Sequence, residues 1–441
     1  MNDRPGFESQ LRLALSAYAG DAPVDVDPTA MAAFAAHAGT RSHGRALPRR
    51  WLLTLAFGAL VAAMVAGALL VGSRLPRPAV ATGPLTIRQT DTMSVTRAGA
   101  SAVELGDGRI LVAGGYNGYP PERGDQWSAD IYDPATGVFT PTDRMTEGRR
   151  DASATRPADG RVLILGGRQS STILTSADLF DPATSTFTPV GSMGTGRAGH
   201  AAVLLTDGRV AIIGGETEPG ISGGSVAAKP DVVYYDVAND QYTAGPSDRG
   251  LEWLDPSAAV LPDGRILIGR GSLEYGVGPA SGPVILDPDD GLVTPAVEGT
   301  DLAFGYVTSL PDGRALIAAS GVTRNRWRIV RRERDGTVDG VADLPAAPVA
   351  PLTALADGRV LILVDERCET IDAYVLDVDR MALAKIGTID GLGACNSWDG
   401  TTVTALRSGG ALIAGGNSAG GESSADAWLV ETTEGSDTRQ P

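Results

Sequence analysis

The sequence is poor in the residues that build metal and redox sites. Among 441 residues it has two cysteines, Cys368 and Cys395, and three histidines, His37, His43 and His200. There is no Cys-x-x-Cys pair and no cluster of cysteine with histidine, so the sequence does not support a zinc site. It also has no EF-hand calcium loop. We therefore expect no metal and no cofactor.

Positive charge and aromatic residues are scarce as well. Lys and Arg number 37 against 53 Asp and Glu, which gives a formal net charge of −16. Such a chain repels a polyanion, and nucleic-acid binding is therefore set aside. Aromatic residues make up 5%, whereas there are 57 glycines and 28 prolines. This composition predicts many turns and short elements rather than long helices.

One long apolar segment interrupts this pattern. Residues 51–72 carry no charge and are long enough to cross about 30 Å of hydrocarbon. Four arginines precede the segment within ten residues, and two follow it closely. The positive-inside rule therefore predicts a single span with its N-terminal side in the cytoplasm. A long secretory signal peptide, cleaved after the small residues at 79–81, remains an alternative.

These features predict five parts of the chain. Residues 1–50 form a cytoplasmic tail with short helices, 51–72 the transmembrane helix, 73–83 a linker, 84–432 a folded region and 433–441 a disordered tail. Small residues spaced four apart within the span allow weak self-association. The tail could bind a cytoplasmic partner.

The folded region is built from a repeat. An Asp-Gly-Arg triplet recurs at intervals of 45 to 56 residues, and a degenerate copy at 408–410 takes the seventh place. The triplets begin at Asp107, Asp159, Asp207, Asp263, Asp312 and Asp357. Seven similar units of about 50 residues indicate a propeller or a solenoid.

Each unit has the pattern of four short strands. A strand of small residues, such as 100–105, precedes the triplet, and Asp-Gly predicts a two-residue hairpin with a primed turn. The next strand is apolar throughout, as in 110–113, which indicates burial on both faces. A third strand ends in an Asp-Pro turn, as in 130–137, and a fourth follows, as in 139–145.

Glycine pairs follow four of the apolar strands. Together with the "YDPATG" type of third strand, they resemble the kelch-repeat β-propellers of the galactose-oxidase-like type over residues 84–431. The pairs are Gly114-Gly115, Gly166-Gly167, Gly214-Gly215 and Gly415-Gly416. The resemblance implies an all-β, seven-bladed propeller and leaves the function open, because propellers host many activities. The copper chemistry of galactose oxidase needs two histidines, whereas the region after the span has only His200.

The two ends of the repeat region complement each other. Residues 87–100 align without a gap with 139–152 and 187–200, so 85–93 read as a fourth strand without three preceding strands. The last unit has three strands, at 401–406, 411–416 and 426–432. We therefore expect the N-terminal strand to complete the last blade, since both ends would otherwise leave unpaired edges.

One face of the propeller collects the candidate ligand-binding residues. Loops after the second and fourth strands emerge on the same face, which also places Cys368 near Cys395 and predicts a disulfide between them. Aromatic and charged side chains in these loops suit a sugar or peptide ligand. They are Tyr116, Tyr119, Glu252, Trp253, Tyr275 and Trp398.

A recurrent arginine is the remaining candidate. Arg97, Arg149 and Arg197 each follow a methionine by four residues, at the expected mouth of the central channel. A ring of arginines could hold an anionic ligand. The alternative is that each arginine pairs with an acid in a neighbouring loop.

Together these observations predict a membrane-anchored module outside the cytoplasm that binds a protein or a glycan. An enzyme acting on sugars (a lyase, epimerase or hydrolase) that uses arginine, tyrosine and glutamate at the channel mouth is the first alternative, and no catalytic residue is assigned. A sensor that signals through residues 1–50 is the second.

Overall fold

The structure is a computed structural model of the 441-residue chain. It describes residues 83–118, 124–217, 231–248, 251, 254–269, 282–297, 302–321, 326–365, 370–393, 400–418 and 421–432. All of these fall within one unit, Pro78–Pro441. None of the described residues belongs to a helix that could cross a membrane. The expected span, the cytoplasmic tail and the C-terminal tail lie outside the described residues.

The described residues fold into seven four-stranded antiparallel sheets, here called blades. From the innermost strand outwards, blade one is β2 (Ser101–Glu104), β3 (Ile110–Ala113), β6 (Ala129–Asp133) and β7 (Val138–Pro141); blade two is β8 (Ser153–Thr155), β9 (Val162–Leu165), β12 (Ala177–Asp181) and β13 (Thr186–Val190); blade three is β14 (Ala201–Leu204), β15 (Val210–Ile213), β16 (Asp231–Asp236) and β17 (Gln241–Ser247). Blade four is β18 (Ser257–Val260), β19 (Ile266–Gly269), β20 (Val284–Leu286) and β21 (Val293–Pro295); blade five is β22 (Leu302–Ser309), β23 (Ala315–Gly321), β24 (Trp327–Arg332) and β25 (Val338–Asp343). Blade six is β26 (Thr353–Ala354), β27 (Val360–Asp365), β28 (Thr370–Asp377) and β29 (Ala382–Asp390); blade seven is β30 (Thr402–Ala405), β31 (Ala411–Ala414), β32 (Ala427–Thr432) and β1 (Leu85–Gln89). Two short hairpins, β4 (Tyr116–Asn117) with β5 (Gly124–Asp125) and β10 (Arg168–Gln169) with β11 (Thr172–Ile173), extend the loops.

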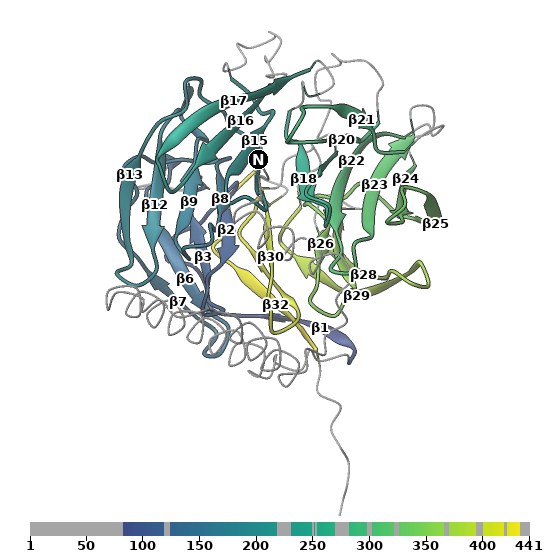
Figure 1. Ribbon diagram of the computed structural model, residues 1–441. Helices are drawn as coiled ribbons and strands as arrows, with labels where there is room; N and C mark the ends of the chain where they lie inside the picture. The colour runs from purple at the N-terminus through teal and green to yellow at the C-terminus, as the bar shows by residue number, and fades with distance from the viewer. Residues whose placement is uncertain are drawn as a thin grey trace, which may run out of the picture. The chain divides into compact units, whose positions relative to one another are not determined.

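The blades form a closed ring, which confirms the predicted seven-bladed propeller. Each innermost strand contacts the innermost strand of the next blade, and β30 contacts β2 to complete the circle. Figure 1 shows the sheets arranged around a common centre. Seven clusters of buried apolar side chains lie between neighbouring blades, one at each of the seven junctions. The core is therefore distributed around the ring.

The second strand of each blade supplies much of this core. All four residues of β3, β9, β15, β19 and β31 are buried, as the unbroken apolar pattern predicts. Each such strand lies between two strands of its own sheet and between two neighbouring blades, so both of its faces meet apolar side chains.

The N-terminal strand closes the ring, as the sequence predicts. Strand β1 pairs antiparallel with β32, from Leu85 opposite Thr432 to Gln89 opposite Trp428. Figure 1 shows the purple strand beside the yellow one, although they come from opposite ends of the propeller sequence. Leu85 is 7% exposed and belongs to the cluster between blades six and seven. Because β1 and β32 pair with each other, the edge that each strand presents to the other is hydrogen-bonded.

The Asp-Gly-Arg turn differs from the predicted two-residue hairpin. In blade one, Gly108 N–H donates to Leu105 O (3.2 Å) and Leu105 N–H donates to Arg109 O (2.7 Å), which makes a three-residue loop. Gly108 has a φ of 89°, whereas Asp107 is not among the residues with positive φ. The loop is a type I turn followed by a left-handed glycine, and a primed turn would need positive φ at its first central residue.

The aspartate and arginine of the triplet hold this loop together. The Asp107 carboxylate accepts hydrogen bonds from the backbone N–H of Arg109 (3.1 Å) and from its Nε (2.9 Å). The other five triplets repeat both contacts. The triplet recurs because each residue has a local structural role. The aspartate accepts the backbone N–H of the loop, the glycine adopts the left-handed conformation, and the arginine neutralises the aspartate.

Candidate functional site

The antiparallel order of the strands gives the propeller two different faces. The Asp-Gly-Arg turns and the turns between third and fourth strands share one, here called the hairpin face. The connections that follow the second and fourth strands share the other, the loop face. The backbone of Arg150, after a fourth strand, bridges to that of Arg168, after a second strand, which confirms that these connections meet.

On the loop face, the glycine pair of one blade lies against the backbone of the next blade. Gly114 and Gly115 have φ angles of 71° and 92°. A Cβ added to Gly114 would lie 2.3 Å from the backbone oxygen of Arg149, so a side chain does not fit. Gly115 N–H donates to that same oxygen (2.8 Å), and the second glycines in blades two and seven make the equivalent bond. Because Arg149 begins the next blade, each pair joins two blades.

The three recurrent arginines are buried below this face. Arg97 is 0% exposed, and Arg149 and Arg197 are each 1% exposed. Arg97 donates to the backbone oxygens of Gly114 (2.7 Å) and Ser128 (2.9 Å), and its Nη2 lies 2.9 Å from the Asp130 carboxylate. Burial lowers the pKa of Arg97, while Asp130 opposes that shift.

The same arrangement recurs in the next two blades. Arg149 pairs with Asp178 at 2.8 Å, with both side chains 0% exposed. Arg197 pairs with Asp231 at 2.7 Å, but the Asp231 side chain is 34% exposed. The expected partner acids therefore lie on third strands rather than in loops. An anionic ligand would have to displace these internal partners.

A second group of charges lies nearer the surface of the loop face, and it forms the candidate site. We call it the loop-face cluster, and it spans blades one to three. Its members are Tyr116, Asp125, Arg150, Asp151, Arg168 and Glu216.

Two arginines connect the cluster. Arg150 pairs with Asp125, and its guanidinium carbon lies 5.3 Å from the ring centroid of Tyr116. Arg168 pairs with Glu216, and its Nε lies 3.1 Å from the Asp151 carboxylate. Arg150 Nε lies 3.8 Å from the same carboxylate. Asp151 therefore stands between two guanidinium groups and joins the two halves of the cluster.

Equivalent positions in successive blades supply these residues. Tyr116, Arg168 and Glu216 each follow a glycine pair and form a backbone bridge to the connection that precedes an innermost strand. Asp151 has a φ of 55° at the position that is glycine in blades one and three. Gly199 N–H donates to Asp151 O (2.8 Å), and Asp151 N–H donates to Gly99 O (2.9 Å). A line of hydrogen bonds between blades fixes the Asp151 backbone in this conformation.

The acids of the cluster lie deeper than its arginines. The side chains of Arg150 and Arg168 are 22% and 25% exposed, whereas those of Asp125, Asp151 and Glu216 are 3%, 15% and 10% exposed. Burial raises the pKa of Asp151 to about 6, against the opposing effect of Arg168 and Arg150. The guanidinium groups of Arg150 and Arg168 therefore contribute more to the surface of the site than the carboxylates with which they pair.

An exposed tryptophan adds a flat surface beside the cluster. Trp127 follows Asp125 by two residues and is 45% exposed. Its indole lies against Gly148, where an added Cβ would stand 2.7 Å from Nε1. Guanidinium edges next to exposed aromatic rings suit hydrogen bonding and stacking with a polar ligand.

Only part of the predicted ligand surface can be compared with the structure. Tyr116 lies in the loop-face cluster. The other predicted loop residues and the expected disulfide lie outside the described residues: Tyr119, Glu252, Trp253, Tyr275, Trp398, Cys368 and Cys395. Asp125, Arg150, Asp151, Arg168 and Glu216 were not predicted from the sequence. Arg168 and Glu216 could have been noticed as the variable residue after a glycine pair, whereas the other three have no such signal.

His200 is packed between blades rather than placed in a site. It is 7% exposed, and its Nε2 lies 2.9 Å from the Ser153 hydroxyl. Burial, with Arg197 nearby, lowers its pKa to about 3. Within the described part of the chain, no group of three His, Cys, Asp or Glu side chains could hold a metal ion.

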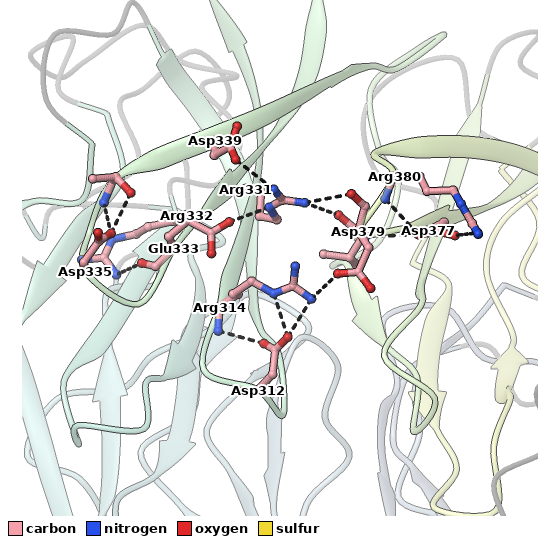
Figure 2. Close-up of polar contacts among 12 residues, drawn as sticks. Asp312, Arg314, Arg331, Arg332, Glu333, Asp335, Asp339, Asp377, Asp379 and Arg380 are labelled. Carbon is pink, nitrogen blue, oxygen red and sulfur yellow. Dashed lines mark hydrogen bonds and ion pairs between the residues drawn. The ribbon is translucent and has the colours of Figure 1, made fainter.

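Some charges on the hairpin face join one blade to the next. Figure 2 shows Arg314, from a triplet turn of blade five, between Asp312 of its own turn and Asp379 of blade six. Arg314 Nη2 lies 2.7 Å and 2.8 Å from these two carboxylates. Arg331 donates to the backbone oxygen of Val378 (2.6 Å) in the same blade-six turn. These contacts have a clear structural role and are not part of the candidate site.

Comparison with known proteins agrees with this architecture. Residues 152–194, which form blade two and the approach to blade three, match the kelch motif. The described residues therefore form a seven-bladed propeller, one blade of which matches the kelch motif. No curated protein matches its sequence.

Two solved structures are similar to this chain at low sequence identity. A fungal alcohol oxidase of the AA5 family, in complex with copper, is 16% identical with a TM-score of 0.54, over 81% of this chain and 78% of that chain. A structure of YjhT is 13% identical with a TM-score of 0.48, over 78% of this chain and 99% of that chain. At such identity the similarity to the galactose-oxidase-like oxidase concerns the fold alone. The copper belongs to that protein.

Proposed function

We propose that this kelch propeller is a membrane-anchored binding module that recognises a protein or glycan ligand outside the cytoplasm through its loop face. Kelch propellers generally mediate interactions. The binding surface is the loop-face cluster together with Trp127. The N-terminal tail would remain in the cytoplasm, free for a partner of its own.

The observation that carries the proposal is the exposure of the two arginines above buried acids. Arg150 and Arg168 keep 22% and 25% of their side chains exposed although each is paired with carboxylates beneath it. The pairing orients the guanidinium groups, so a ligand would lose little additional side-chain entropy on binding. The Arg150 guanidinium lies over the Tyr116 ring, and Trp127 offers an apolar surface to a sugar ring or an aromatic side chain.

Binding can be tested with the full-length protein and a matched pair of variants. Thermal unfolding is measured with neutral and acidic oligosaccharides, and any ligand that binds only the folded state raises the unfolding temperature. Arg150→Ala with Arg168→Ala should abolish that increase. Arg161→Ala is the control, because Arg161 pairs with Asp159 on the hairpin face and its side chain is 42% exposed. A ligand whose effect survives the double substitution would place binding elsewhere.

The membrane topology needs a separate measurement. Alkaline phosphatase fused after residue 432 should be active, and a cytoplasmic reporter fused there should be inactive. The reverse result would exclude binding outside the cytoplasm.

A sugar-active enzyme is the second candidate, and Asp151 is the residue that favours it. Its pKa of about 6 is near that required of a general acid or base. If a sugar is found that binds, Asp151→Asn should abolish any turnover while binding persists. Bound sugar that the wild type leaves unchanged would favour the binding module.

A further inference from the structure

One arginine on the hairpin face occupies a position that is apolar in all other blades. Arg332 ends β24 and lies opposite Ala315, the first residue of the second strand. The equivalent residues lie opposite the first residue of the second strand in the other blades. They are Tyr132, Phe180, Tyr235, Leu286, Leu376 and Val430, none more than 1% exposed. Each packs into the cluster between its own blade and the preceding one.

Arg332 keeps the burial of this position but lacks a carboxylate partner. It is 7% exposed. Its Nε donates to the backbone oxygen of Ala296 in blade four (3.2 Å), and its Nη1 donates to that of Glu333 (3.4 Å). No carboxylate of the described residues lies within 4.0 Å of its guanidinium, and Nη2 makes no hydrogen bond to them. Burial lowers the pKa of Arg332 and neighbouring Arg265 lowers it further, while Asp263 and Asp335 oppose that shift.

The nearby acids are engaged elsewhere. Asp263 pairs with Arg265 at 2.6 Å. Asp335 accepts hydrogen bonds from the backbone N–H of Thr337 (2.9 Å) and from its hydroxyl (2.7 Å). Figure 2 shows Arg332 beside Asp335, and its dashed lines at Asp335 include the two contacts with Thr337. A buried guanidinium without a carboxylate in direct contact is unfavourable, so a ligand that supplies such a contact would be favoured.

Arg332 lines a groove that could admit such a ligand. The groove has a volume of about 370 Å³ and lies between the triplet turns of blades four and five. Arg334 also lines it, with its Nε 3.2 Å from the position of a Cβ on Gly313. Asp263 and Asp312, which face the same groove, are each neutralised by the arginine of their own triplet. Arg332 and Arg334 make no ion pair with a described carboxylate, so both guanidinium groups can contact an anion in the groove.

We propose that this groove binds an oxyanion group, a phosphate, sulfate or carboxylate, through the guanidinium of Arg332 with Arg334 as a second contact. A guanidinium presents paired N–H donors that match the oxygens of such a group. The site lies on the hairpin face, so it is independent of the ligand proposed for the loop face.

The test compares anions on the full-length protein at constant ionic strength. Inorganic phosphate, sulfate and acetate are titrated against chloride, and both the unfolding temperature and the heat of binding are measured. At least one oxyanion should raise the unfolding temperature beyond chloride, and the three titrations show whether tetrahedral anions or carboxylates are preferred. No difference from chloride for any of the three would overturn the proposal.

Variants assign the effect to the groove. Arg332→Leu introduces the residue found at this position in blades four and six, so folding should be retained, and the dissociation constant should rise at least about tenfold. Arg334→Ala should weaken binding only about two- to threefold, because this side chain is exposed. Arg144→Leu, an exposed arginine after a fourth strand, removes the same charge and should leave binding unchanged. An anion effect that persists in Arg332→Leu would also overturn the proposal.

Discussion

The buried pair of Arg97 and Asp130 should be among the most sensitive points of the propeller. Both side chains are 0% exposed, and the guanidinium also binds Gly114 and Ser128. Asp130→Ala removes the only carboxylate that Arg97 contacts among the described residues. The charge would then remain buried without compensation, which typically costs about 3–5 kcal/mol.

The protein contains its own control for this estimate. Asp231 plays the same part for Arg197, but its side chain is 34% exposed. Water can replace part of the lost carboxylate there, so Asp231→Ala should cost only about 1–2 kcal/mol. The Asp178 side chain is 0% exposed like that of Asp130, so Asp178→Ala should cost as much as Asp130→Ala.

Urea unfolding followed by tryptophan fluorescence measures these free energies of unfolding. The double variant Arg97→Met with Asp130→Leu should cost less than Asp130→Ala alone, because it removes both charges together. Equal losses for Asp130→Ala and Asp231→Ala would show that burial of the partner does not set the cost, and the reasoning would be wrong.

Three further predictions address the ring, the glycine pairs and the loop-face cluster. Deleting residues 84–94 removes β1 and exposes the edge of β32, so the unfolding temperature should fall sharply; an unchanged value would contradict closure by this strand. Gly114→Ala should cost more than about 2 kcal/mol because its Cβ would meet a backbone oxygen at 2.3 Å, whereas Gly108→Ala, with open space around it, should cost about 1 kcal/mol in urea unfolding. The raised pKa of Asp151 means that the folded state binds its proton more tightly than the unfolded state, so this group stabilises below about pH 4 and that contribution is lost as the pH rises through about 6. The stability of the wild type relative to Asp151→Asn should therefore rise as the pH falls from 7 to 4, by up to about 3 kcal/mol, and a pH-independent difference would contradict the assignment.

The regular part of the molecule could be predicted because it repeats. The triplets, the apolar second strands and the alignment around Met93 give seven units and place β1 in the last blade. The prediction of a primed two-residue turn was wrong in one respect. The glycine of the triplet has the expected positive φ, but the aspartate does not. The local sequence Asp-Gly is compatible with both loops, and the strand register decides between them.

The site was harder to predict because its residues interrupt the repeat. Arg97, Arg149 and Arg197 drew attention by recurring, and recurrence in this fold marks positions that join blades. Arg150, Asp151 and Arg168 do not recur, and no local pattern indicates that they meet. They come together because connections from three blades converge on the loop face.

The sequence alone determined the number of blades, the order of strands and the closing strand, since period, polarity and turn residues act over a few residues at a time. The tertiary structure decided which charges are buried and which remain available. Arg97 and Arg332 look equally polar in the sequence, but Arg97 contacts an aspartate on a third strand, whereas Arg332 contacts only backbone oxygens among the described residues. The packing of one blade against the next, set by residues distant in the chain, determines that difference.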